Sequence, residues 1–226
     1  MHNLMWEHRG GFRRISLQFG GSVDMKSAFA TMTIVALTVV MPADAANAQI
    51  QTTEVGKSHM EFDCATTAKL RLYVRSGEVR VVGSNDGKIT VDLTGKKADM
   101  IQDVKAQLTC RQSVSELHVS GGPKNELLIT IHVPKNVDLY ARIPAGEVTI
   151  EEIAGNKDVE MYAGELTIYV GKASDYRHVD ASVYAGEVDA EIFGDNKGGL
   201  FRTVSKDANG QYHLHAHVGS GQLTLR

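Results

Sequence analysis

The chain has 226 residues, which is enough for one sizeable hydrophobic core or two small ones. Its 24 lysines and arginines nearly balance 27 aspartates and glutamates, and the formal net charge is −3. This balance excludes the strongly basic surface that nucleic-acid-binding domains carry. Glycine is common and proline rare, 22 against 4, which indicates many tight turns rather than a disordered chain.

Residues 25–48 have the pattern of a secretory signal peptide. A charged start at Lys26 precedes an apolar run over residues 28–41, and an alanine-rich cleavage region follows. Cleavage after Ala48 is favoured, and cleavage after Ala45 also fits. The competing interpretation is a membrane-anchoring or amphipathic helix, but the run is short for a membrane span and no stop-transfer charges follow it.

The segments on either side of this leader carry little pattern. Residues 1–24 are interpreted as an upstream extension, with translation beginning at Met25. Arg13 and Arg14 within it only weakly resemble a twin-arginine signal, and no cysteine follows the cleavage region closely enough for a lipoprotein anchor. Residues 49–58 are expected to be a disordered linker. The leader predicts an exported protein, periplasmic or extracellular, with no membrane span after cleavage.

Two cysteines, Cys64 and Cys110, lie in the part that follows the leader. An exported protein meets an oxidising compartment, and two cysteines make one bridge, so a Cys64–Cys110 disulfide is predicted. The alternative, a reactive or metal-bound thiol pair, lacks the CxxC spacing that such sites use.

Residues 59–134 read as a series of short strands. Apolar and polar residues alternate over 70–74, 78–81 and 88–93, and again over the runs that begin at 104, 116 and 127. A polar piece at 96–103 is long enough for one helical turn. No long helical pattern occurs anywhere, so residues 59–226 are predicted to form an all-β domain.

The rest of the chain is organised by a recurring turn. Ala-Gly-Glu occurs three times, and related Ser-Gly turns stand before and after these copies; the predicted structural turn residues are Gly77, Gly146, Gly164, Gly186 and Gly221. Each turn separates two alternating runs, and a glycine at the same place in every copy indicates a bend that tolerates no Cβ.

Alignment on these glycines produces apolar columns, which predict coils stacked in chain order around a thin core. Val148, Leu166, Val188 and Leu223 form one column, Ile150, Ile168, Ala190 and Leu225 a second, and Ile143, Met161, Val183 and Val218 a third. The predicted fold is a single-domain β-solenoid, a β-helix-like stack of short strands with a sheet-rich N-terminal part. Residues 200–205 and 212–218 are expected to form an extra hairpin.

The segment Ile131–Leu139, followed by the Gly-Glu-Val coils and the closing strand Gly221–Leu225, resembles the bacterial putative-adhesin family. The resemblance covers most of residues 60–226. It implies an exported β-solenoid domain, largely of unknown function, and it supplies no catalytic residues. Glutamate stands after the turn glycine where many members of that family have aspartate.

Two sets of side chains are candidates for ligand contact. The residues after the turns are Glu78, Glu147, Glu165 and Glu187, and the last three are expected on neighbouring coils, where they could share a calcium ion. The more favoured interpretation is that they accept hydrogen bonds from the amides of their own turns. Tyr162 and Tyr184 precede two of the turns, with Tyr140 and Tyr169 nearby; they could stack on a ligand or simply reflect strand preference.

The strand 212–218 carries three histidines at alternate positions. His213, His215 and His217 should point outward together, because Leu214, Ala216 and Val218 fill the inward phase. If the strands that lead into Gly186 and Gly221 are neighbours aligned on these glycines, the histidines lie beside His178, Asp180 and Ser182. His213, His215, His217 and Asp180 therefore form a candidate zinc or copper site. The favoured alternative is a polar, exposed edge that resists pairing with other chains.

No nucleophile elbow, phosphate loop or zinc-protease motif is present, so a non-enzyme is expected. The predicted function is non-catalytic binding or scaffolding at the bacterial cell envelope, adhesive in one version, with an envelope protein or glycan as partner. The alternative is a periplasmic metal-binding or stress-sensing module that uses the histidine strand. A third hypothesis, a carbohydrate-active enzyme, requires an acidic pair across one face.

Overall fold

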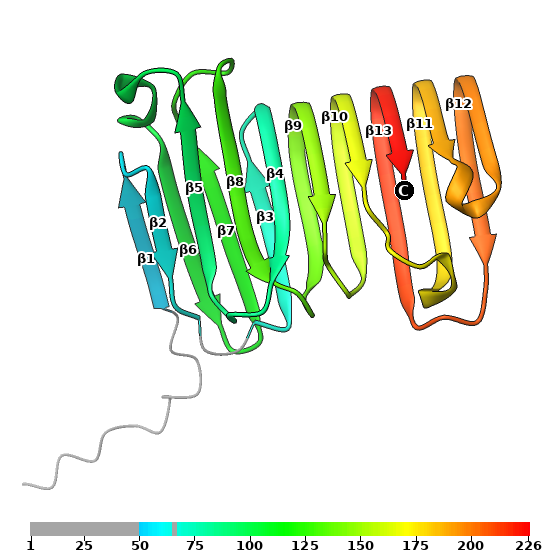
Figure 1. Ribbon diagram of the computed structural model, residues 1–226, viewed down its shortest axis with the longest axis horizontal. Helices are drawn as coiled ribbons and strands as arrows, with labels where there is room; N and C mark the ends of the chain where they lie inside the picture. The colour runs from blue at the N-terminus through cyan, green and yellow to red at the C-terminus, as the bar shows by residue number, and fades with distance from the viewer. Residues whose placement is uncertain (1–49, 65–66) are drawn as a thin grey trace, which may run out of the picture. The chain divides into compact units, whose positions relative to one another are not determined.

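The computed structural model describes residues 50–64 and 67–226 (Figure 1), so the predictions for residues 1–48 lie outside the described residues. Within these ranges the chain contains strands and short 3₁₀ helices but no α-helix, which confirms the all-β prediction. No helix there is long and apolar enough to cross a membrane.

In chain order the elements are β1 (Ile50–Val55), β2 (His59–Phe62), β3 (Lys69–Val74), β4 (Gly77–Ser84), β5 (Ile89–Gly95), η2 (Ala98–Ile101), β6 (Lys105–Arg111), β7 (Val114–Ser120), β8 (Leu127–Pro134), β9 (Asp138–Glu151), β10 (Lys157–Ile168), η3 (Ala173–Asp175), β11 (Tyr176–Ala190), η4 (Glu191–Phe193), β12 (Asp195–Asp207) and β13 (Tyr212–Leu225).

The segment expected to be a disordered linker is in part a strand, so that prediction was wrong. β1 pairs antiparallel with β6, from Ile50 opposite Cys110 to Val55 opposite Lys105. Alternation is weak in this segment because its residues are mainly polar, but threonine and valine favour the extended conformation of this mostly exposed strand at the end of the sheet.

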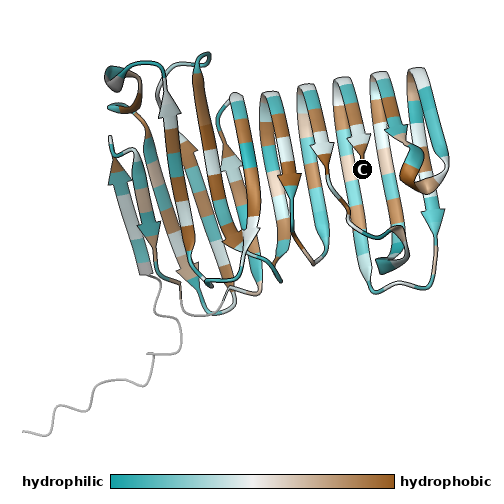
Figure 2. Cartoon of the chain, in the orientation of Figure 1, coloured by the Kyte–Doolittle hydropathy of each residue, from teal (hydrophilic) through white to brown (hydrophobic). Residues whose placement is uncertain are grey.

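All the strands belong to one open sheet of 13 strands, and β9 is where its two arms meet. The first half of β9 pairs with β3, and its second half pairs with β4. One arm runs β1-β6-β7-β3-β9, and the other runs β2-β5-β8-β4-β9. Figure 2 shows apolar and polar residues alternating along the strands, and the buried residues of both arms form a single core cluster.

The long strands bend at the repeated glycines, as the sequence predicted. Gly146, Gly164, Gly186 and Gly221 have φ between +124° and +141°, a region that L side chains rarely adopt. In each of them a Cβ atom would lie 1.8–2.0 Å from the carbonyl oxygen of the glycine on the next strand. The turns therefore stack backbone against backbone, with no room for a side chain.

The three apolar columns are confirmed, but the strands are not stacked in chain order. β13 lies between β10 and β11, and it is parallel to both. The expected hairpin of 200–205 with 212–218 was therefore wrong, since β12 pairs antiparallel with β11 on the side away from β13. Because the sheet is open and the strand order is permuted, the predicted solenoid form is not confirmed.

β12 ends the sheet at the C-terminal side, and its composition explains why the core stops there. Val204 is its one buried residue. Lys206 and Asp195, which lie opposite the inward residues Val179 and Ala190 of β11, form an ion pair of 3.1 Å. Charged residues in the inward phase of an end strand oppose the addition of another chain.

The predicted disulfide is present between Cys64 and Cys110, with a Cα–Cα distance of 6.2 Å. It joins the segment after β2 to the end of β6. Since β2 and β6 belong to different arms of the sheet, the bridge ties the two arms together near their N-terminal edge.

Candidate functional site

The first halves of β9, β10, β13 and β11, together with β3, present a broad surface that we call the polar face. Their outward side chains lie in register across the strands. One row is Tyr73, Arg142, Glu160, His217 and Ser182, and the row below it is Arg71, Tyr140, Asp158, His215 and Asp180. Aromatic, acidic and basic side chains thus alternate along a line perpendicular to the strands.

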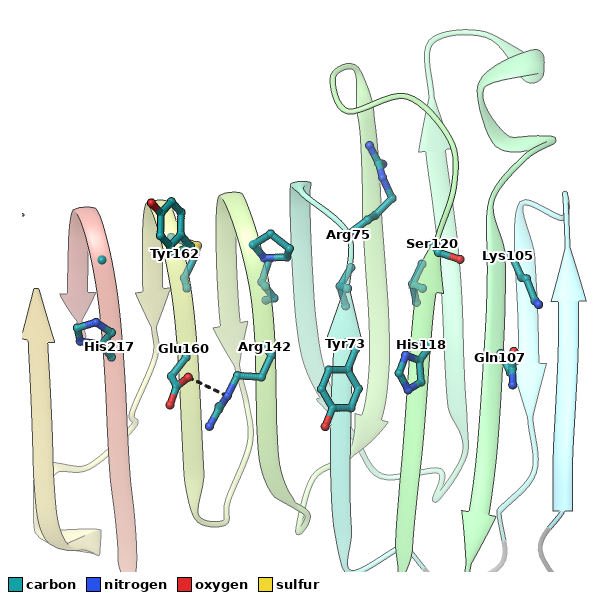
Figure 3. Close-up of a pocket in the computed structure, with 16 residues that line it drawn as sticks. Tyr73, Arg75, Lys105, Gln107, His118, Ser120, Arg142, Glu160, Tyr162 and His217 are labelled. Carbon is teal, nitrogen blue, oxygen red and sulfur yellow. Dashed lines mark ion pairs between the residues drawn. The ribbon is translucent and has the colours of Figure 1, made fainter. Parts of the chain in front are cut away.

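Two adjoining pockets follow these rows. The first has a volume of about 830 Å³, and its lining includes Tyr73, His118, Arg142, Glu160 and Tyr162. Figure 3 shows Tyr73, Arg142, Glu160 and His217 side by side on successive strands of this pocket. The second pocket has a volume of about 580 Å³ and is lined by residues of the lower row, including Tyr140, Asp158 and His215.

Arg142 is the centre of the polar contacts on this face. Its guanidinium contacts Asp158 Oδ1 at 3.0 Å and Glu160 Oε2 at 3.1 Å. It also lies over the Tyr140 ring, 3.6 Å from the ring centre, and donates hydrogen bonds to the carbonyl oxygens of Ala141 and Asp158. One arginine therefore holds two carboxylates of β10 in fixed positions.

Stacked rings form the β3 side of the first pocket. Tyr73 stacks on His118 of β7, with ring centres 4.6 Å apart, and meets Tyr140 edge-on at 6.3 Å. His118 Nε2 lies 2.6 Å from Glu116. Each of these side chains is held by a neighbour, so the pocket wall is pre-formed.

Tyr162 and Tyr184 occupy the same level of the face, just below the glycine turns, and both are exposed. The residue between them on β13 is Gly219, which leaves a gap two strand spacings wide, about 9.6 Å. Tyr184 packs edge-on against Phe201 of β12. Tyr169 lies elsewhere, directly after β10 and on the far side of its glycine turn, so the four tyrosines do not form one cluster.

The histidine strand has the predicted orientation and register. Leu214, Ala216 and Val218 are buried. His213, His215 and His217 lie beside His178, Asp180 and Ser182 respectively. β13 is an interior strand, however, so the interpretation of this strand as an exposed edge was wrong; the edge is β12.

The four residues predicted as one metal site have different partners. His215 Nδ1 is 3.3 Å from Asp180, and His217 Nδ1 is 2.9 Å from Ser182. His213 instead has the tilted ring of His178 beside it, with ring centres 6.4 Å apart. Among the described residues, the ligand atoms that come together are those of Asp158, Glu160 and His215. His215 is the one member of the predicted set that belongs to this group.

The glutamates after the turns are exposed, but their order differs from the prediction. Glu78, Glu147 and Glu165 are direct neighbours, while Gln222 of β13 separates Glu165 from Glu187. The expected neighbourhood of Glu187 with Glu165 was therefore wrong, because β13 is inserted there.

A buried lysine lies beneath the second pocket. Lys157 occupies an inward position at the start of β10, and its Nζ donates hydrogen bonds to Tyr176 Oη at 2.6 Å and to the Gly155 carbonyl at 3.2 Å. Burial lowers the pKa of the Lys157 ammonium to about 8. Burial likewise lowers the pKa of Arg75, which lines the first pocket.

No known family model matches the sequence, and curated proteins likewise give no match. Three solved structures match 77–79% of the chain at low sequence identity. A putative cell adhesion protein from Clostridium sporogenes has a TM-score of 0.48 and 12% identity, covering 79% of this chain and 98% of its own. A putative adhesin from Bacteroides fragilis has a TM-score of 0.32 and 12% identity, covering 78% and 97%. A putative lipid binding protein from Parabacteroides distasonis has a TM-score of 0.23 and 8% identity, covering 77% and 96%.

Two of these structures are described as adhesion proteins, as is the family that the sequence resembles. At these TM-scores the likenesses assign neither a family nor a function to this chain.

Proposed function

We propose that the chain is a non-catalytic binding protein of the bacterial cell envelope that holds an extended glycan across its polar face. The observation that carries the proposal is the first pocket, about 830 Å³ of open space lined by rings and by charged groups. Sugar rings stack on aromatic faces through their apolar sides, while paired polar groups accept and donate hydrogen bonds to hydroxyls. The rows run perpendicular to the strands, so a linear ligand would cross several of them.

The state of the carboxylates supports binding rather than hydrolysis. Asp158 and Glu160 are an acidic pair on this face, with carboxylate oxygens within 4.8 Å of each other. A glycosidase requires one carboxylic acid to protonate the leaving group while the other acts as a carboxylate. Both carboxylates here ion-pair with Arg142, an arrangement suited to two ionised groups. The carbohydrate-active enzyme is therefore not the function that we favour.

Two features support the cell envelope as the location. The predicted leader at residues 25–48 directs export. The Cys64–Cys110 bridge is typical of proteins that fold in an oxidising compartment. Adhesion would be the consequence if the bound glycan belonged to another cell or to a host surface.

The test is binding of the mature protein to a panel of bacterial polysaccharides, with a matched pair of tyrosine variants. Tyr162→Ala removes an exposed ring of the polar face, and Tyr169→Ala removes an exposed ring outside that face. We expect saturable binding to at least one polysaccharide, weakened about tenfold or more by the first variant and unchanged by the second. Equal binding by both variants contradicts the proposal. If the protein captures an envelope protein and binds no polysaccharide, its partner is a protein and not a glycan.

A further inference from the structure

Three potential metal ligands meet on the polar face, on two neighbouring strands. One ligand atom from each of Asp158, Glu160 and His215 lies within 4.8 Å of the other two. Asp158 is directly opposite His215 in the parallel pairing of β10 with β13. All three side chains are partly accessible, so an ion could reach them from solvent. We propose that they form a binding site for a divalent transition metal, with zinc as the best match.

The histidine is already oriented for this role by a residue on the opposite side. Asp180 of β11 lies 3.3 Å from His215 Nδ1. In the proposed site this carboxylate takes the Nδ1 proton, which would fix the tautomer and leave the lone pair of Nε2 for a metal. Because β13 lies between β11 and β10, the ring is held from one side and the carboxylate ligands stand on the other. This carboxylate–histidine pair is the common outer support of metal-ligating histidines.

Arg142 fixes the two carboxylates without using all of their oxygens. It contacts Oδ1 of Asp158 and Oε2 of Glu160, and each carboxylate retains its second oxygen. The guanidinium therefore orients both ligands, but its positive charge also opposes a second cation nearby. These two effects predict binding in the micromolar range rather than the nanomolar range of closed structural zinc sites.

The donor set selects the class of metal. Magnesium and calcium prefer all-oxygen sites, whereas an imidazole nitrogen favours zinc and its transition-metal neighbours. Zinc with three protein ligands keeps one open position, as in sites that bind a further molecule. That position would open toward the two pockets, since Glu160 lines the first and Asp158 and His215 line the second.

The test is zinc calorimetry on the tag-free, disulfide-bonded protein, with cobalt absorption spectra to report the ligand set. The wild type should bind one zinc ion per chain. His215→Ala and Glu160→Gln should each weaken binding at least about tenfold, and Asp180→Asn, which alters a positioning residue, should weaken it about 10- to 100-fold. His213→Ala is the matched control, because His213 is on the same strand but outside the ligand group, and it should bind zinc as the wild type does.

The cobalt spectrum separates this site from a nonspecific surface histidine. The visible bands of the cobalt-loaded wild type should be lost in His215→Ala and retained in His213→Ala. Absence of saturable zinc uptake by the wild type overturns the proposal, and so does an equal loss of affinity in the two histidine variants. Neither result bears on glycan binding, which is measured separately through Tyr162.

Discussion

The carbonyl oxygen of Gly164 lies 1.9 Å from the position that a Cβ atom on Gly221 would occupy. These two glycines are 57 residues apart in the chain but directly paired between β10 and β13. The same contact recurs from Gly146 to Gly77 and from Gly186 to Gly221. The bend of the sheet therefore depends on an uninterrupted line of residues without side chains. One methyl group on Gly146, Gly164, Gly186 or Gly221 must push two strands apart.

Gly221→Ala is expected to destabilise the protein by more than about 3 kcal/mol, because it combines a strained φ of +138° with a backbone clash. Gly198→Ala is the control, since a Cβ at Gly198 in β12 would meet no atom within 4 Å. Urea unfolding of both variants measures the difference. A Gly221→Ala protein as stable as the control would contradict the role of the glycine line.

The sequence was sufficient to predict which residues face the core but not which strands are neighbours. Period-two alternation fixes the phase of each strand that alternates clearly, so the columns through Val148 and Ile143 were predicted correctly. The same pattern does not determine strand order. On local pattern alone, β13 could pair equally well beyond β11 or between β10 and β11. The 17 residues from Glu191 to Asp207 form η4 and the antiparallel strand β12, and they let the chain return to the inner position.

Removal of the disulfide should destabilise the protein substantially. The bridge between Cys64 and Cys110 closes a separation of 46 residues, for which the chain-entropy model gives about 4 kcal/mol. We expect the Cys64→Ala, Cys110→Ala double variant to lose about 2–5 kcal/mol of unfolding free energy. Unfolding with and without reductant provides the internal check. The wild type should lose stability in reductant, and the double variant should not respond; a response in the variant would point to another cause.

The candidate site was only partly predictable for the same physical reason. The outward phase of His213, His215 and His217 follows from one strand alone. The contact of Arg142 with Asp158 and Glu160 requires knowing that β9 and β10 pair in register, and the stack of Tyr73 on His118 joins strands 45 residues apart. Lys157 carried a readable signal, since it shares the inward phase of Val159 and Met161. An inward lysine marks a position where the core must provide hydrogen-bond partners.

The exported protein is predicted to begin at Gln49, or at Ala46 if the alternative cleavage site is used. Either start retains β1, whose Ile50 is paired with Cys110 beside the disulfide. Intact-mass measurement of protein recovered from the periplasm distinguishes the two starts. A mass that still includes residues 25–45 would show that the leader is retained as an anchor. A mature start after Val55 would mean that β1 is dispensable in the exported protein.

Lys157 should make stability depend on pH in an identifiable window. Its pKa is about 8 in the folded protein and 10.5 as an exposed lysine. Between these values the unfolded chain carries the proton and the folded chain does not, so the unfolding free energy rises with pH. Below about pH 8 both states carry the proton, and the full cost of burying the charge is present. Relative to a Lys157→Met variant, the unfolding free energy of the wild type should rise by about 2 kcal/mol between pH 8 and 9.5.

The comparison with the variant isolates this effect from Tyr176, which contacts the same ammonium. Burial raises the pKa of Tyr176, so its own contribution is a loss of stability at higher pH, above the range proposed for the measurement. Lys172→Met, at an exposed position, controls for the removal of a lysine as such. Urea unfolding of the three proteins at pH 7, 8, 9 and about 9.5 is the measurement. If the difference between wild type and Lys157→Met stays constant over this range, Lys157 does not titrate there, and its hydrogen bonds to Tyr176 and Gly155 keep it charged in the core.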